Sequence, residues 1–235
     1  GTAAAHPLAD HRYTPESLDF ATQYFWRVDE AGDSGAYAGD TWSFTTEEFA
    51  VVDDFENYND SDRCLYDAWI DGVTNGTGSY VGYENSNNGT FGETIIVHGG
   101  RQSMPISYDN AKPPYYSEAR RTFDAAQDWT AHGADTLSLF FQGALDNSPE
   151  SLYVTIKDNS KSATSAHSDA AATTIAEWQQ WKIPLSEFAS AGVKMTSVKE
   201  MAIGVGNKTT GGAGKMFIDD IVVGAPLELV VLACK

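Results

Sequence analysis

The sequence predicts an all-β fold, a two-sheet antiparallel β-sandwich of the jelly-roll type with a β-hairpin ahead of it. From Val51 onward, short stretches of alternating apolar and polar residues recur, which is the pattern of half-buried strands. The loops between them are rich in Gly, Asn, Asp and Ser, and only 185–191 has a helical pattern. The chain shows neither strand–helix–strand units nor internal repeats, so a parallel sheet is not expected.

The sandwich strands are expected in order along the rest of the chain. The first lies in 51–60, where acids are set among apolar residues. The others are Thr94–Val97, Gln102–Tyr108, Ser117–Phe123, Thr136–Gly143, Ser151–Lys157, Trp178–Pro184, Ser197–Val205 and Met216–Val223. Short strands of this kind, joined by turns, favour two packed sheets. A chain of 235 residues, 42% hydrophobic and 12% aromatic, is long enough for one large sandwich or two small domains.

The hairpin is predicted from two alternating segments. Tyr24 and Trp26 share one strand face, and Trp42 and Phe44 do the same after a Gly-rich turn region. This spacing resembles the last two strands of a fibronectin type III domain, which implies a secreted parent protein built of several modules. Because a lone hairpin exposes its aromatic rings, we expect it either to dock on the neighbouring sandwich or to be poorly ordered.

The chain is expected to divide into a partial fibronectin type III-like segment (1–47), a β-sandwich (48–224) and a linker or tail (225–235). The apolar run in the tail is too short to span a bilayer. No signal-peptide pattern is recognised, so we take the chain to begin within a longer protein. Cys64 and Cys234 lack the spacing of a zinc site, and the sequence does not determine whether they form a disulfide.

Acidic residues gather in the first and last strand patterns of the sandwich: Asp53, Asp54, Glu56, Asp219 and Asp220. First and last strands often lie side by side in a sandwich, which would bring these carboxylates together. Like charges a few ångströms apart raise one another's pKa, and Ca²⁺, which prefers oxygen ligands, would relieve the repulsion. We therefore expect a structural calcium site, with Asp54, Glu56, Asp219 and Asp220 as candidate ligands. The alternative is that the acids are solvated charges protecting a sheet edge.

Three motifs, in 52–56, 181–188 and 217–221, resemble in order and spacing the non-catalytic carbohydrate-binding modules of the jelly-roll type, with family 11 the closest. The resemblance implies a concave face that binds a neutral glycan such as β-glucan. It also implies a structural calcium between the terminal strands, and Asp54, Glu56 and Asp220 fall on the matching acidic positions.

Alternation also indicates which side chains leave the core. It places Phe140, Gln142 and Tyr153 outside, and we expect Phe140 and Tyr153 on adjacent strands of one open face. Ala202 and Gly204 would form a flat floor beside them. A sugar ring has apolar C–H faces and polar edges, so its site requires exposed aromatic rings flanked by polar side chains.

Other candidates flank this face. Arg120 would line it unless the strand turns Arg121 outward instead. Three aromatic residues in or beside the long Gly/Asn-rich loop could line one end. The candidate ligand-binding residues are Trp69, Tyr80, Tyr83, Arg120, Phe140, Gln142 and Tyr153. The alternative is that a loop or the hairpin covers Phe140 and Tyr153 as a second core, and that Trp69 only pins its loop.

The net charge of the chain argues against certain classes of binding partner. With 33 acids against 15 bases, the formal net charge is −18, so neither nucleic acid nor an anionic membrane surface is an expected partner. A neutral polysaccharide or oligosaccharide and other modules of the parent protein fit better. We expect a monomer in a secreted or cell-surface protein of bacterial origin.

An enzyme is not expected. Glycoside hydrolysis needs two carboxylates at a set separation, and the acids occur as adjacent pairs instead. A lyase would need His, Tyr and Arg clustered, and only His98, Arg101 and the run Glu118–Arg121 hint at this. The sequence thus favours a sugar-binding module. The alternatives are a structural or adhesion module without sugar binding, and a small jelly-roll lyase or hydrolase.

Overall fold

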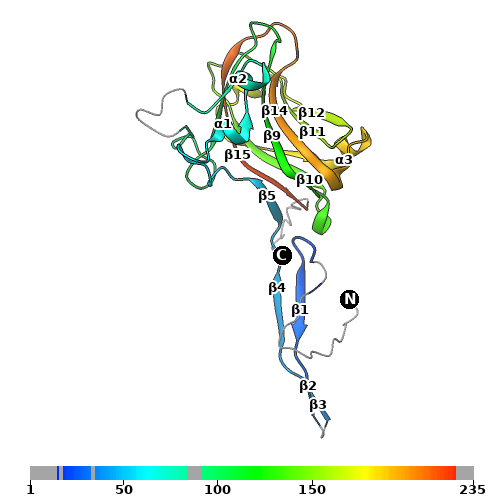
Figure 1. The fold of residues 1–235 in the computed structure, drawn as a ribbon. Helices are drawn as coiled ribbons and strands as arrows, with labels where there is room; N and C mark the ends of the chain where they lie inside the picture. Colours follow the sequence, from blue (N-terminus) through cyan, green and yellow to red (C-terminus); the bar gives the residue numbers. More distant parts are fainter. Residues whose placement is uncertain (1–14, 16–17, 33–34, 84–90, 226–235) are drawn as a thin grey trace, which may run out of the picture.

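The computed structural model of the chain describes residues 15, 18–32, 35–83 and 91–225. It is a β-sandwich from which a long hairpin projects (Figure 1). Nearly all of the regular structure is strand, and the strand pairs of the described residues are antiparallel. The predicted all-β sandwich is therefore confirmed.

One sheet of the sandwich has six strands, which run in the order β13-β10-β15-β8-β7, with β5 paired to β15. Their bounds are β5 Phe49–Asp53, β7 Ser79–Val81, β8 Met104–Asp109, β10 Thr136–Gln142, β13 Gln179–Pro184 and β15 Ala213–Gly224. The pairing of β5 with β15, which sets Asp53 opposite Ile221, confirms that the first and last sandwich strands are neighbours.

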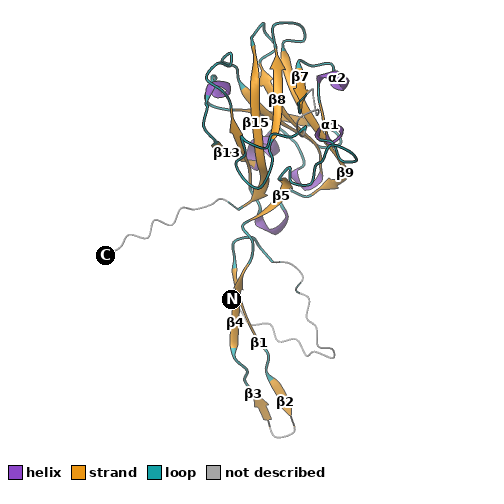
Figure 2. Cartoon of the chain, turned by 90° about the vertical axis from the view of Figure 1, so that its left-hand side faces the viewer, coloured by secondary structure: helices purple, strands orange, loops and turns teal. Residues whose placement is uncertain are grey.

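The other sheet has five strands, in the order β12-β11-β14-β9-β6. Their bounds are β6 Trp69–Ile70, β9 Tyr116–Gln127, β11 Leu152–Lys157, β12 Ser162–Ala166 and β14 Val198–Gly206. Helices are short: α1 Leu65–Ala68, α2 Gly72–Asn75 and α3 Leu185–Ser190, with single 3₁₀ turns η2 Ala131–Gly133, η3 Ala172–Thr174 and η4 Met195–Ser197. Figure 2 shows the long strands of the sandwich with the short helices around them.

The core lies between the two sheets and follows the alternation of the strands. Leu137, Leu139 and Phe141 of β10 are fully buried, as are Leu152 and Ile156 of β11. Burying such side chains contributes roughly 1.5–3 kcal/mol each. The inward residues expected in these two strands are confirmed, which fixes the opposite side chains as outward.

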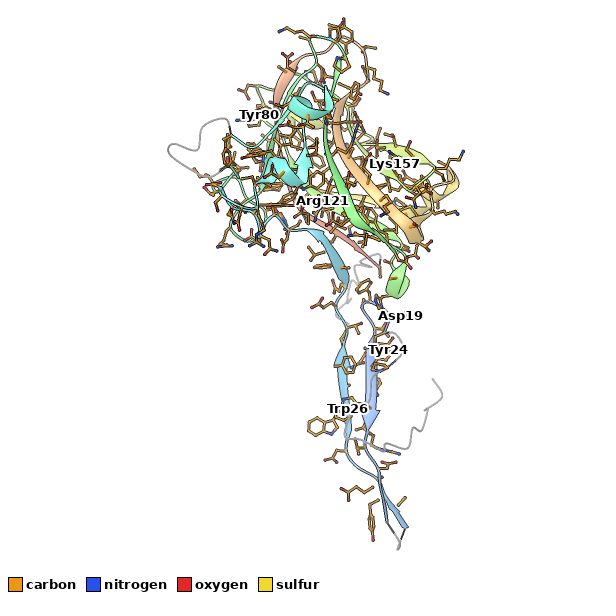
Figure 3. The ribbon with its side chains drawn as sticks, viewed as in Figure 1. Asp19, Tyr24, Trp26, Tyr80, Arg121 and Lys157 are labelled. Atoms are coloured by element: carbon orange, nitrogen blue, oxygen red, sulfur yellow. The ribbon has the colours of Figure 1, made fainter. Side chains whose placement is uncertain are left out.

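The hairpin consists of β1 (Gln23–Arg27) paired with β4 (Thr41–Thr45), extended at its tip by β2 (Glu30–Gly32) and β3 (Gly35–Tyr37). On one face Tyr24 stacks on Phe44 and Trp26 stacks on Trp42, with ring centroids 5.8 and 6.3 Å apart. Trp26 and Trp42 are 51% and 58% exposed, and the labelled Trp26 lies well away from the sandwich (Figure 3).

Among the residues that the structure describes, the hairpin contacts the sandwich at its base. There Phe20 N–H donates to the carbonyl of His132, and His132 Nδ1 lies 2.7 Å from the carbonyl of Leu18. The expected docking of the aromatic hairpin face on the sandwich does not occur, because the described contacts lie at the hairpin base and Trp26 and Trp42 remain exposed.

Two local predictions differ from the structure. Thr94–Val97 is a loop. The preceding residue, Glu93, forms a bridge with Ser103, whose hydroxyl donates to the carbonyl of Ile96. The edge strands β6, β7 and β12 were not foreseen. The strands β6 and β7 have only two and three residues, and β12, Ser162–Ala166, consists of Ser, Ala and Thr and carries almost no apolar signal. No helix in the described part of the chain is long and apolar enough to cross a membrane. Segments 1–14 and 226–235, with Cys234, lie outside the described residues.

Candidate functional site

The outer face of the five-stranded sheet brings several of the candidate residues together. Strand register places Tyr153 of β11 opposite Gly204 of β14, which in turn lies opposite Glu118 of β9. One step along, Ala202 lies opposite Arg120. We call these five residues the Tyr153 face. Among the alternatives for β9, the structure therefore turns Glu118 and Arg120 outward.

The floor of the Tyr153 face is made of small residues. Ala202 and Gly204 are buried beneath neighbouring side chains, as the predicted flat floor requires. The ring of Tyr153 lies directly over Gly204, so that a Cβ atom there would overlap Cζ of the ring. Tyr153 is only 9% exposed, so most of its ring is covered in the folded chain. The alternative that Tyr153 is covered therefore describes the structure better than an open aromatic face does.

A polar network runs across the Tyr153 face. The hydroxyl of Tyr153 donates to Oε1 of Glu118 over 3.0 Å, and Nη2 of Arg120 donates to the other carboxylate oxygen, also over 3.0 Å. Arg120 also lies 3.6 Å from Oε1 of Glu200, which Lys157 approaches to 3.9 Å. Lys157 ends the network, on the right of the sandwich in Figure 3. The network holds the outward side chains in one arrangement before any ligand binds.

The network also sets the protonation of its members. Burial, reinforced by the negative charge of Glu118, raises the pKa of Tyr153 well above its usual range, so the hydroxyl stays a donor. Burial works against the charged form of Arg120, but the carboxylates of Glu118 and Glu200 outweigh it and raise the pKa of the guanidinium. Arg120 is therefore a fixed, partly exposed cation between two carboxylates.

Phe140 and Gln142 do not lie on the Tyr153 face. Their strand, β10, belongs to the six-stranded sheet, whereas β11 belongs to the five-stranded sheet, so their outward side chains lie on the opposite side of the sandwich. The expectation that Phe140 and Tyr153 share one open face is therefore wrong. The residues between β10 and β11 cross from one sheet to the other, so the two strands are not neighbours.

A loop residue covers Phe140. The imidazole of His98 stacks on its ring with centroids 3.4 Å apart and an interplanar angle of 16°. Gln142 is half-buried, and its Nε2 donates to the carbonyl of Ala176. This agrees with the alternative reading that a loop would cover Phe140.

Trp69 is fully buried, so the structure does not place it on a ligand-accessible surface. Its Nε1 donates to Oδ2 of Asp53 over 2.8 Å, and its ring packs 6.0 Å from that of Phe55. The alternative reading, that Trp69 pins its loop, describes this arrangement. Sequence position beside a long loop gave no signal of this burial, because the ring packs against core residues remote in sequence and its N–H is satisfied by Asp53 of β5.

Tyr80 and Tyr83 lie in or just after β7, the strand at the opposite edge of the six-stranded sheet from β13, away from the Tyr153 face. Tyr80 lies in β7 opposite Ser107 and is half-buried. The hydroxyl of Tyr83 donates to Glu93, and the ammonium of Lys215 lies 4.5 Å from the centroid of its ring. The structure thus divides the candidate ligand-binding residues between two sides of the sandwich.

Arg121, the residue that the sequence left as an alternative to Arg120, points inward. Its Nη1 donates to the carboxylate of Asp53, which also accepts hydrogen bonds from Tyr58 and Trp69. Asp53 is 7% exposed. This acid is therefore neutralised by the protein's own cation.

The other acids have separate partners. Glu56 accepts from the backbone N–H of Arg101 and Gln102, while Asp220 lies 2.6 Å from Nδ1 of His98. Oδ2 of Asp219 accepts from the backbone N–H of His98 and Gly99. The loop 98–102 thus lies between Glu56 and the acids of β15.

The fit of these acids to a calcium ion is partial. In the residues that the structure describes, no three Asp, Glu, His or Cys side chains are grouped as a metal site. Asp219, however, is fully buried, and burial raises its pKa to about 6. Its hydrogen bonds come from backbone N–H groups, with no cationic side chain among the donors. A buried carboxylate of this kind, on a strand beside β5, is a suitable anchor for a hard cation.

The residues that hinted at a lyase are dispersed. His98 pairs with Asp220 of β15 and Arg101 with Glu56, whereas Glu118 and Arg120 lie on the other sheet and Arg121 points into the core. Cys64 is a buried free thiol.

Comparison with solved structures gave similar folds of low sequence identity. The family 11 carbohydrate-binding module of a cellulosomal cellulase of Clostridium thermocellum is 18% identical, with a TM-score of 0.47, covering 75% of this chain and 95% of that chain. The family 30 module of another cellulosomal cellulase of that organism is 15% identical, with a TM-score of 0.46, covering 58% and 82%. A comparison with curated proteins gave no match.

The family comparison is more specific. Residues 54–225 match the family model described as carbohydrate binding domain 30. The resemblance to carbohydrate-binding modules that the sequence motifs indicated is thereby confirmed. Since the match covers more than half of the chain, from the residue after β5 to the end of β15, the chain belongs to the carbohydrate binding domain 30 family.

Proposed function

We propose that the chain is a non-catalytic module that binds a neutral glycan chain, such as a β-glucan, along the Tyr153 face. The observation that carries the proposal is the arrangement of that face: a tyrosine ring lying flat over Gly204, with the polar groups of Glu118 and Arg120 beside it. The fixed donors and acceptors suit the hydroxyl groups of a sugar, and the small part of the ring that stays exposed can meet its apolar C–H face.

The shape and charge of the face favour a neutral chain. Its floor consists of strand residues without bulky side chains, so an extended ligand can lie across it. Arg120 and Lys157 are offset by Glu118 and Glu200, and the whole chain carries a net charge of −18. An anionic polymer would therefore be repelled, while a neutral one would not.

Within a larger protein, the proposed role is to hold a secreted polysaccharide-degrading enzyme on its substrate. The bacterial, extracellular setting and the fibronectin type III-like character of the hairpin are parts of this proposal. The module itself would do no chemistry, because binding and orientation suffice for targeting.

The test is affinity electrophoresis through gels cast with neutral glucans, xylan, mannan or a uronate polymer. We expect retardation in at least one neutral gel, and weaker retardation for Arg120→Ala and Tyr153→Ala. Lys182→Ala, an exposed residue of the other sheet, is the matched control. Unchanged mobility in every gel, or release of sugars from the polymers, would contradict the proposal.

We also propose a structural Ca²⁺ beside the β5–β15 strand pair, with Asp219 as its anchor and Asp54, Glu56 and Asp220 as the other candidate ligands. The buried, cation-free carboxylate of Asp219 supports it. The ion would contribute folding energy through oxygen coordination and no reaction step.

A further inference from the structure

The outer face of the six-stranded sheet carries an aromatic cluster that the proposed function does not use. Phe140 of β10 lies under the stacked ring of His98, and the indole of Trp178 meets that imidazole edge-on, with centroids 5.8 Å apart. Trp178 directly precedes β13, and Gln180 lies two residues further on, opposite Phe140. We call His98, Phe140, Gln142, Trp178 and Gln180 the Trp178 patch.

The polar side chains of the Trp178 patch are held in place by hydrogen bonds and keep further donor and acceptor atoms for a ligand. Nε2 of Gln142 donates to the carbonyl of Ala176, and Nε2 of Gln180 donates to the hydroxyl of Ser138. These bonds fix both amides and leave their Oε1 atoms without a donor in the described chain. Trp178 is half-buried. Its indole Nε1–H has no hydrogen-bond acceptor among the residues that the structure describes.

Fixed side-chain amides beside a partly exposed indole and imidazole are the groups that a sugar-binding site uses. The rings match the apolar C–H face of a pyranose, while two amide oxygens and an indole N–H match its hydroxyl groups. The acids nearest the patch, Glu177 and Asp220, disfavour an anionic ligand. The ligand class that fits is therefore a neutral glycan.

The position of the Trp178 patch determines whether a glycan bound there could be the same chain that binds the Tyr153 face. The two sheets pack about 10 Å apart, and their outer faces point in opposite directions. A rigid glycan chain lying on the Tyr153 face cannot also lie on the Trp178 patch. We propose that the Trp178 patch is a second neutral-glycan site, so that one molecule holds two glycan chains at once. This inference rests on the proposed function for the choice of ligand class.

The test is two-dimensional ¹H–¹⁵N NMR of the whole chain, titrated separately with cello-, xylo- and manno-hexaose. The indole N–H signal of Trp178 is assigned from Trp178→Phe, and the backbone amide of Gly204 reports on the Tyr153 face. With one of the sugars we expect both signals to shift. In Tyr153→Ala the Trp178 shift should persist, and in Gln180→Ala its apparent Kd should rise several-fold while the Gly204 titration is unchanged.

The outcomes separate the two proposals. If Gly204 shifts to saturation with a sugar while Trp178 does not move, the second site is overturned and the Tyr153 face stands. If Trp178 shifts only when Tyr153 is intact, its movement is transmitted from the first face and the second site is again overturned. If neither signal moves with any of the sugars, both proposals fail. Lys182→Ala, on the same strand as Gln180 but outside the patch, should titrate as the wild type.

Discussion

Tyr153 lies across Gly204, with its ring over the very position where any larger residue would place a side chain. Replacing Gly204 by Ala should therefore push the ring off the floor. We expect Gly204→Ala to lower the free energy of unfolding by about 1–3 kcal/mol, as overpacking does, and to weaken glycan binding. Denaturant unfolding and affinity electrophoresis measure the two effects.

The matched control is Gly32→Ala, because a Cβ at Gly32 meets nothing within 4 Å. It should change neither stability nor binding. If Gly204→Ala unfolds like the wild type and binds as tightly, the ring does not depend on its glycine floor.

Arg121 is expected to be essential for stability because it is the cation of a buried acid. Removing it in Arg121→Met leaves the carboxylate of Asp53, which is 7% exposed, without its charge partner. We expect a loss of about 3–5 kcal/mol in the free energy of unfolding. Adding Asp53→Asn should recover part of it, because the second substitution removes the unpaired charge. A double variant no more stable than Arg121→Met would contradict this pairing.

Asp158 should make the stability of the fold depend on pH in the acidic range. Hydrogen bonds from the backbone N–H of Lys194, then of Ser160 and Lys161, hold its pKa below the usual range. A lowered folded pKa gives stability that is present above the unfolded value, about 3.9, and is lost as pH falls through the folded value. Asp158→Asn should flatten the decline in melting temperature below about pH 4. Glu177→Gln, at an exposed acid, should leave the decline as it is.

The proposed calcium predicts a response to chelation. A ligand present at about 100 times its Kd stabilises the fold by about 2.7 kcal/mol, which for a domain of this size corresponds to about 5–10 °C in Tm. EDTA should lower Tm by this amount, and Asp219→Asn should abolish the difference. An unchanged melt in EDTA, with no metal found by elemental analysis, would rule the site out.

Much of the fold was readable from the sequence, because alternation reports which side chains face the core. It placed Leu139 and Leu152 inside and Tyr153 outside, and it identified Ala202 and Gly204 as a floor. The neighbouring positions of the first and last strands were expected because such strands often lie side by side in a sandwich. These features depend on residues close in sequence, or on a general property of sandwiches.

The sheet to which each strand belongs was not readable. Alternation is the same in both sheets, so it could not show that Phe140 and Tyr153 lie on opposite sides of the molecule. Nor could it show that Trp69 is buried, since that depends on the distant carboxylate of Asp53. The rest of the candidate site depends on such contacts between remote segments, of which a single sequence carries no local signal.

The central claim, that the Tyr153 face binds a neutral glycan, is tested most directly by the Kd of a neutral hexasaccharide for matched variants. Calorimetry on Tyr153→Ala and Arg120→Ala should give a Kd at least about tenfold higher than that of the wild type, equivalent to about 1.4 kcal/mol. Lys182→Ala should match the wild type. Equal affinities for all four proteins, each shown to be folded by its melting curve, would mean that the glycan does not bind this face.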